Sequence, residues 1–201
     1  MNECVDVLVV GSGNAGLCAA ISASQMGKKV LIIEKAPFSF RGGNSSLTMN
    51  FRFSHTKISQ LLELIDIEDR DEDKEKILYN NYVPYSEKNF HEDLLKVSNN
   101  LTDYHLSKDL SENSLSIIKW LRSLGHRWEY KPTTHHMPSS VPVRLKGSGS
   151  SLQKHNFLVA ESLGILIEYD CQLKSILFRD EKVSGVIAWT KGGLREILAH
   201  S

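Results

Sequence analysis

Runs of branched apolar residues and a helical pattern alternate at the start of the chain. Residues 5–10 form a nearly continuous apolar run rich in Val, which is typical of a strand buried on both faces. Residues 15–26 are rich in Ala and end at Gly27, so they predict a helix. Residues 30–33 are a second buried strand. The spacing predicts a parallel β-α-β unit.

The middle of the chain predicts helices and one highly charged stretch. We expect a short helix near residues 58–65, a second over residues 86–97, and a third that starts at Ser111 as its N-cap. Residues 66–76, DIEDRDEDKEK, are interpreted as a solvated helix face or a mobile excursion rather than a binding patch. The apolar stripe of the third helix consists of Leu115, Ile118, Leu121 and Leu124.

The last third predicts a loop, a helix and a small sheet. Residues 135–151 contain two prolines and a Gly-Ser-Gly sequence and are expected to form a loop, after which Ser151 begins a helix through Leu163. A strand over residues 165–169 follows. Tight turns then separate three further strands, which predict an antiparallel meander over residues 173–178, 183–189 and 194–198.

Composition excludes several classes of protein. The 201 residues include 24 Lys or Arg and 24 Asp or Glu, so the formal net charge is zero, which argues against a broad nucleic-acid or membrane surface. No run approaches the ~20 apolar residues of a membrane span, and no signal peptide is recognisable, so we expect a cytoplasmic protein. The cysteines have no CxxC spacing and are expected to be reduced thiols: Cys4, Cys18 and Cys171.

A glycine motif follows the first predicted strand and opens the first predicted helix. In G-x-G-x-x-G the first glycine allows a tight turn, the second allows a pyrophosphate to approach the backbone, and the third allows close helix packing. The phosphates then face the free N–H groups of the helix start. The motif predicts a dinucleotide site and consists of Gly11, Ser12, Gly13, Asn14, Ala15 and Gly16.

Glu34 ends the second predicted strand, about 20 residues beyond the glycines. An acid at this place accepts hydrogen bonds from ribose hydroxyls and repels a 2′-phosphate, so NADP is disfavoured. Lys35 follows directly and is included in the expected site.

A second stretch of bare backbone follows, and it bears on the choice between FAD and NAD. Extra backbone surface suits a longer dinucleotide, although an ordinary flexible loop is an equally good physical interpretation. The long helical excursion and the meander favour FAD, because an NAD-type Rossmann half adds a third parallel strand quickly. The residues of this stretch expected in the site are Gly42, Gly43, Asn44 and Ser45.

Two segments, VDVLVVGSGNAGLCAAISASQMGKKVLIIEKAP and RGGNSSLTMNFRF, resemble the N-terminus of a known FAD-binding domain. The family is the fumarate reductase/succinate dehydrogenase flavoproteins, and within it the closest likeness is to tricarballylate dehydrogenase-type members. Residues 147–198 also resemble this family. The resemblance implies an α/β, Rossmann-like domain of an FAD-dependent oxidoreductase that transfers hydride between flavin and a small di- or tricarboxylate.

The resemblance also implies roles for individual residues. The motif glycines would hold the FAD pyrophosphate, Glu34 its ribose, and the second glycine stretch would lie along the flavin. Some family members attach FAD covalently through a His in that stretch. Asn44 stands there, so FAD is expected to be non-covalent. Met49 and Asn50 replace a Gly pair of many members, which we expect to reshape the flavin pocket.

The same resemblance predicts an incomplete domain. We expect residues 1–55 to form the β-α-β unit and flavin loop, residues 56–145 a helical excursion, and residues 146–201 the helix and meander. The family continues with a closing FAD segment and a cap domain that carry its catalytic Arg and His, so the cap is expected to be absent and no catalytic residue is named. The alternatives are a truncated or split product without activity of its own, which could await a partner chain, and an NAD-linked dehydrogenase.

The remaining candidate residues have simpler interpretations. Arg52, His55 and Arg144 could contact a carboxylate, but a structural or solvated role is favoured. The adjacent His135 and His136 have poor metal geometry, so no metal site is expected. Core packing is expected for Trp120, Trp128 and Trp189.

Overall fold

The computed structural model describes residues 4–130 and 143–200. The chain divides into two compact units, one made of Met1–Thr48 with Gly149–Ser201 and the other of Met49–Ser148. Within the described residues no helix is long and apolar enough to cross a bilayer.

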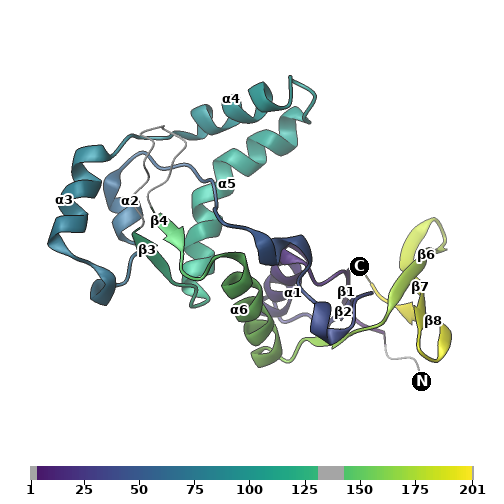
Figure 1. The fold of residues 1–201 in the computed structure, drawn as a ribbon. Helices are drawn as coiled ribbons and strands as arrows, with labels where there is room; N and C mark the ends of the chain where they lie inside the picture. The colour runs from purple at the N-terminus through teal and green to yellow at the C-terminus, as the bar shows by residue number, and fades with distance from the viewer. Residues whose placement is uncertain (1–3, 131–142, 201) are drawn as a thin grey trace. The chain divides into compact units, whose positions relative to one another are not determined.

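The first unit is built on a parallel sheet (Figure 1). Strand β1 (Val7–Val10), helix α1 (Asn14–Gln25) and strand β2 (Val30–Ile33) form the predicted β-α-β unit. Strand β5 (Leu166–Glu168) pairs with β2, giving the parallel order β1-β2-β5. All four β2 residues are buried, as their continuous apolar pattern predicts.

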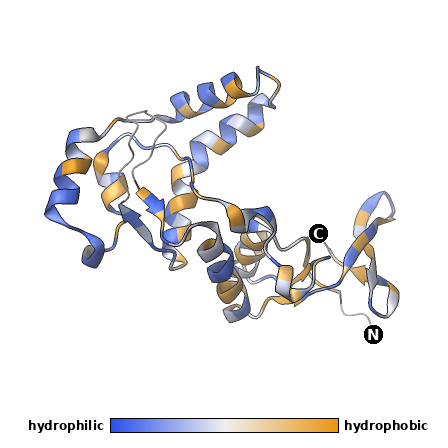
Figure 2. Ribbon diagram, viewed as in Figure 1, coloured by the Kyte–Doolittle hydropathy of each residue, from blue (hydrophilic) through white to orange (hydrophobic). Residues whose placement is uncertain are grey.

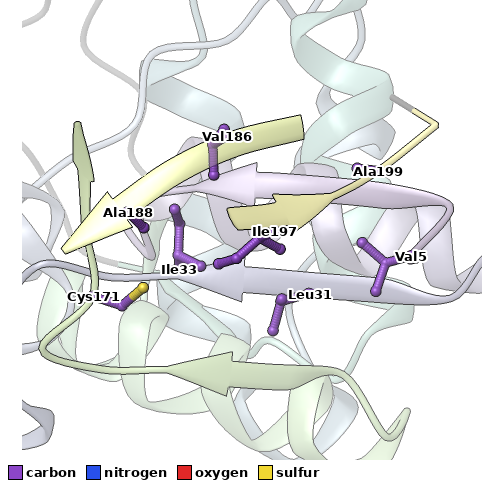
Figure 3. Close-up of a cluster of buried hydrophobic side chains, with 8 residues drawn as sticks. All are labelled: Val5, Leu31, Ile33, Cys171, Val186, Ala188, Ile197 and Ala199. Carbon is purple, nitrogen blue, oxygen red and sulfur yellow. The ribbon is translucent and has the colours of Figure 1, made fainter. Parts of the chain in front are cut away.

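The meander completes the first unit. Strands β6 (Gln172–Arg179), β7 (Lys182–Thr190) and β8 (Gly193–Leu198) pair antiparallel, which confirms the prediction. The backbone N–H of Val5 donates to Leu198 O at 3.2 Å, so the meander fixes the chain that enters β1. Side chains of the two sheets share one buried cluster (Figure 3), made of Val5, Leu31, Ile33, Cys171, Val186, Ala188, Ile197 and Ala199.

Helix α6 (Ser148–Ser162) starts three residues before the predicted Ser151. Gly147 and Ser148 both have positive φ, +79° and +58°, and turn the chain directly into the helix. The predicted loop is also wrong for strand β4 (Val143–Leu145), which pairs antiparallel with β3 (Trp128–Tyr130). His135 and His136 lie outside the described residues.

The second unit contains α2 (Ile58–Leu62), α3 (Glu72–Asn81), α4 (Glu87–Val97) and α5 (Tyr104–Ser123), with the β3-β4 pair. Hydrophobic and hydrophilic residues are interspersed along α4 and α5 (Figure 2). The described residues also include the short 3₁₀ turns η1 (Phe38–Phe40), η2 (Gly43–Leu47) and η3 (Ile67–Asp69).

Helix α5 begins earlier than predicted. Its N-cap is Asp103, whose side chain accepts a hydrogen bond from Leu106 N at 2.9 Å. Ser111 therefore lies inside the helix, where its hydroxyl donates to Lys108 O at 2.8 Å. A serine suits either position, since its hydroxyl can cap a helix or bond back to the preceding turn.

The charged stretch is only partly solvated. The carboxylate of Asp66 is 11% exposed and pairs with Arg122 and Arg127, and Asp69 pairs with Lys146 at 3.2 Å. The first turn of α3 remains exposed, as expected. The interpretation of residues 66–76 as one solvated face is therefore wrong at its N-terminal end, because those acids fasten residues 66–69 to α5 and the β3-β4 pair.

Candidate cofactor site

The glycine motif forms a turn that leaves no room for side chains on its inner face. Gly11 follows β1 with φ of +96°, and its N–H donates to Ile33 O at 2.8 Å. A Cβ on Gly16 would lie 1.9 Å from Gly11 O, so only glycine permits this approach of α1 to the turn. A Cβ on Gly13 would meet no heavy atom within 4 Å. The turn is closed toward the protein and open at Gly13.

The start of α1 carries no side-chain cap. Gly13 is the N-cap residue, with extended backbone, and it has no side chain to accept from the first-turn N–H groups. These groups and the positive end of the helix dipole favour an anion at this place. The open side of Gly13 and the uncapped helix start together form a cradle that a phosphate fits.

Glu34 is tied to the glycine turn. Its Oε2 accepts from Ser12 N at 2.7 Å and from Ser12 Oγ at 2.8 Å, while its Oε1 accepts from Ala36 N at 2.8 Å. Burial alone raises the pKa of Glu34, but the hydrogen bonds from Ala36 and Ser12, with the nearby Lys35 ammonium, lower its pKa below the usual range. A carboxylate offers about four acceptor positions, so the ionised Glu34 can accept from a ligand as well.

The second glycine stretch lies in a left-handed turn. Gly42 and Gly43 have φ of +104° and +57° and lead into η2. Asn44 is exposed and Ser45 is half-buried. A Cβ on Gly149 would lie 2.0 Å from Ser45 O, and Gly149 N donates to Thr48 O at 2.7 Å. The first turn of α6 thus packs directly on this stretch.

Arg41 anchors the same stretch. Its guanidinium carbon lies 3.9 Å from the ring centroid of Phe38 and 4.1 Å from that of Phe157, which are two cation–π contacts. Its Nη1 donates to Tyr169 Oη at 2.9 Å and lies 3.4 Å from Glu161. These contacts hold the chain before Gly42 against α6.

Two buried amides on α6 were not among the predicted site residues. Gln153 is 3% exposed, and neither atom of its amide has a hydrogen-bond partner. Its Cβ and Cγ would lie 3.5 Å from a Cβ on Gly42. Asn156 is fully buried, and its Nδ2 donates to Asn14 Oδ1 at 3.2 Å. The available signal was a pair of amides at i, i+3 on an otherwise apolar helix face.

The structure therefore brings the predicted residues together around one end of the sheet and α6. The glycine turn, Glu34 and the exposed Lys35 adjoin at the ends of β1 and β2, and α6 contacts both the glycine turn and the Gly42 stretch. All of these residues belong to the first unit. Among the described residues, no group of three His, Cys, Asp or Glu side chains is placed to hold a metal ion.

The other candidates lie in the second unit or outside a core. Arg52 pairs with Asp93 at 3.6 Å. His55 is 2% exposed, and burial lowers its pKa to about 4, so its imidazole is neutral. Trp128 is buried as expected, whereas the expectation is wrong for Trp189, which is 49% exposed on β7, the central strand of the meander.

The chain matches known flavoproteins. The sequence profile described as "FAD dependent oxidoreductase" matches residues 6–114. The fumarate reductase (cytochrome) of Shewanella frigidimarina is 35% identical over 127 residues, which cover 62% of this chain and 18% of that protein. The NADH:fumarate oxidoreductase of Klebsiella pneumoniae (strain 342) is 28% identical over 187 residues, covering 90% and 18%. The chain thus spans about a fifth of the length of these relatives.

A solved structure has the same architecture. The open conformation of a flavocytochrome c3 fumarate reductase superposes with a TM-score of 0.73 at 25% identity, covering 98% of this chain and 32% of that one. This similarity confirms the predicted α/β class, with a parallel start and an antiparallel meander, as part of a longer flavoprotein fold.

Proposed function

Because the chain belongs to the FAD dependent oxidoreductase family, we propose that it forms the cofactor-binding part of an enzyme that transfers hydride between FAD and a small di- or tricarboxylate. FAD is the cofactor of this family, and when bound it supplies the hydride-transfer chemistry. The observation that carries the proposal is the uncapped start of α1, open at Gly13 and flanked by the ionised Glu34.

In this proposal the glycine turn holds the FAD pyrophosphate. The backbone N–H groups at the start of α1 donate to phosphate oxygens, and the bare Gly13 allows them to come within hydrogen-bond distance. The residues assigned to this part of the site are Gly11, Ser12, Gly13, Asn14, Ala15 and Gly16.

Glu34 has two tasks in the same proposal. Its bonds from Ser12 stiffen the glycine turn, and its remaining acceptor capacity receives the hydroxyls of the adenosine ribose. Its negative charge disfavours a ribose that carries a 2′-phosphate. Lys35 lies at the exposed rim beside it.

The second glycine stretch is assigned to the flavin side. Gly42, Gly43, Asn44 and Ser45 offer backbone and small polar groups there. Residues 38–50 contain no His, Cys or Tyr, so no side chain of this stretch offers the nucleophile for a covalent bond to a flavin, and we propose that FAD is held without one.

The substrate class rests on the relatives. Two of them are named for fumarate, a four-carbon dicarboxylate, which supports a small carboxylate as the substrate here. The groups that bind the substrate and move its proton are not assigned to residues of this chain. The chain spans about a fifth of the length of these relatives. Catalytic turnover is therefore proposed for the longer enzyme of which this chain forms the cofactor-binding part.

A second candidate function is FAD binding without turnover until a further polypeptide segment adds to the sheet. The observation that favours it is the strand order β1-β2-β5, in which β1 has a strand neighbour on one side within the described residues, and Val10 is 49% exposed. A partner chain carrying a cap and a closing segment is the occupant that this candidate requires.

The visible absorption spectrum of the purified chain, before and after denaturation, tests both candidates. The proposal expects flavin bands, present as isolated or after addition of FAD, and free FAD in the filtrate after denaturation. Oxidation of the reduced flavin by fumarate supports the enzyme, and stable reduced flavin in the presence of fumarate favours the second candidate. A colourless chain that takes up no FAD contradicts both.

A further inference from the structure

We propose that Asn156 of α6 is a positioning residue for FAD, because it holds the Asn14 carboxamide so that its NH₂ group faces the pyrophosphate at the start of α1. The inference rests on the proposed function and extends it to a residue more than a hundred positions from the glycine motif. Asn156 would act through Asn14 and would not touch the cofactor.

The hydrogen bonds at Asn14 determine the orientation of its side-chain amide. Asn156 Nδ2 donates to Asn14 Oδ1 at 3.2 Å, and Cys18 Sγ lies 3.8 Å from the same oxygen as a weaker donor. The oxygen of a planar carboxamide and its NH₂ group point in different directions from the same carbon. Directing the oxygen toward Asn156 and Cys18 therefore directs the NH₂ group away from them.

The partner on α6 is held in place by its surroundings. Asn156 is 0% exposed, and α6 is held at its first turn by the bond from Gly149 N to Thr48 O and by the close packing on Ser45. Cys18 carries no charge in this setting, because burial raises its pKa to about 11. The Asn14 oxygen is therefore held by neutral donors on a fixed support.

The place of Asn14 gives its NH₂ group a use. Asn14 is the first residue of α1, directly after Gly13, where the helix start has no side-chain cap and a side chain on residue 13 would meet no atom within 4 Å. An amide NH₂ group here adds a neutral donor to the backbone N–H groups that face an anion. The plainer interpretation is a packing bond between two amides, with no effect on the cofactor.

Substitutions at Asn156 and at Asn14 separate the two interpretations. In Asn156→Asp the donor to Asn14 is lost, so the Asn14 amide turns over and presents its oxygen to the pyrophosphate. We expect the Kd for FAD to rise about tenfold, the effect of losing one hydrogen bond to a charged group. Asn14→Ala removes the NH₂ group outright, with a similar expected rise.

The double variant gives the decisive comparison. If Asn156 acts through Asn14, Asn156→Asp produces no further rise in Kd when Asn14 is already Ala. Equal effects in the two backgrounds, or no effect of Asn156→Asp on FAD binding, overturn the inference. Lys154→Ala, at an exposed position of the same helix, is the matched control and should leave the Kd unchanged.

Asn14→Asp covers the case in which Asn156→Asp does not fold. Asp accepts from Asn156 as Asn does, and an acid in the first turn stabilises a helix, so this variant should fold. Its second carboxylate oxygen would face the pyrophosphate, and FAD should bind more weakly than to Asn14→Ala. Binding as tight as that of Asn14→Ala overturns the inference.

Affinity can be read from the quenching of flavin fluorescence, and the ³¹P resonances of bound FAD report directly on the pyrophosphate. We expect these resonances to shift in Asn14→Asp and Asn156→Asp and to stay in place in Lys154→Ala. If the unsubstituted chain itself binds no FAD, the proposed function fails and this inference fails with it. If it binds FAD and the variants behave like Lys154→Ala, only the inference fails.

Discussion

A Cβ on Gly16 would lie 1.9 Å from the carbonyl oxygen of Gly11, because α1 crosses the end of β1 with bare backbone against bare backbone. The hydrogen bond from Gly11 N to Ile33 O also fixes the glycine turn to the end of β2. The glycine turn is therefore part of the packing of the sheet as well as the floor of the proposed FAD site.

The first prediction concerns this contact. Gly16→Ala should lower the free energy of unfolding by about 3 kcal/mol, because the turn or the helix must move to admit the methyl group. Thermal and urea denaturation of the chain measure the loss. A variant as stable as the unsubstituted chain would show that α1 has freedom to move away from the turn.

Gly13→Val should have a small effect on stability and a large effect on FAD binding. Its side chain has open space and extended backbone, so the expected cost in stability is about 1 kcal/mol, from a poorer N-cap. The side chain would occupy the proposed pyrophosphate position, and FAD uptake should be abolished. Gly192→Ala, at a glycine of the meander where a Cβ would make an ordinary 3.7 Å contact with Thr190 Oγ1, is the control and should retain uptake. Undiminished FAD binding by a folded Gly13→Val would place the pyrophosphate elsewhere.

The contribution of Glu34 to stability should depend on pH. Its pKa is lowered in the folded chain, so its stabilising effect is complete above the unfolded pKa of about 4.3 and is lost as pH falls through the folded pKa. Glu34→Gln should remove that dependence and cost about 2 kcal/mol at pH 7, since an amide cannot accept all three bonds from Ser12 and Ala36. Urea denaturation from pH 7 to 3 would measure both effects, and identical pH profiles for the two chains would contradict the assignment.

The two buried amides of α6 should respond differently to Met. Gln153→Met removes an amide that has no partner, so we expect stability to be unchanged or raised by about 1 kcal/mol. Asn156→Met on the same helix breaks the bond to Asn14 and should lower stability by a similar amount. Denaturation of both variants without FAD tests this contrast. A marked loss of stability in Gln153→Met would mean that its amide is paired in solution.

Local sequence predicted what depends on local geometry. The glycine turn joins a strand and a helix that are adjacent in sequence, and the meander turns at Asp180 and Glu181, both with positive φ, are tight. The register between these elements follows from short connections and continuous apolar runs. For the same reason the predicted glycine residues and Glu34 are neighbours in the folded chain.

Longer-range features were not predictable in this way. The contact of Asn14 with Asn156 joins residues 142 positions apart, and no periodic pattern in the sequence predicts it. The pairing of β3 with β4 is also non-local, and the start of α5 was misplaced because Ser111 and Asp103 have equal cap chemistry. The anchoring of Arg41 is non-local as well, because its guanidinium contacts the ring of Phe157 on α6 in addition to that of Phe38.

The last prediction concerns His55 in the second unit. Its side chain is 2% exposed, its Nε2 has no partner, and burial lowers its pKa to about 4 from an ordinary 6.5. Between these two pKa values the imidazole is protonated in the unfolded chain and neutral in the folded chain. The contribution of His55 to the free energy of unfolding is therefore complete above pH 6.5 and falls as the pH drops toward 4. The difference in pKa corresponds to a loss of roughly 3 kcal/mol.

Two measurements follow this effect. The imidazole ¹H resonances of His55 should titrate well below pH 5, and denaturation midpoints should fall between pH 6.5 and 4. His55→Asn should reduce that slope, although it also alters the 3.4 Å contact of the imidazole with Tyr82 Oη and should lower stability at pH 7. Asp6→Asn, at a half-buried position of the first unit, leaves the surroundings of His55 untouched and is the control. Titration of His55 near pH 6.5 would mean that water or a charged group reaches the ring. That result would contradict the description of His55 as a buried, neutral imidazole.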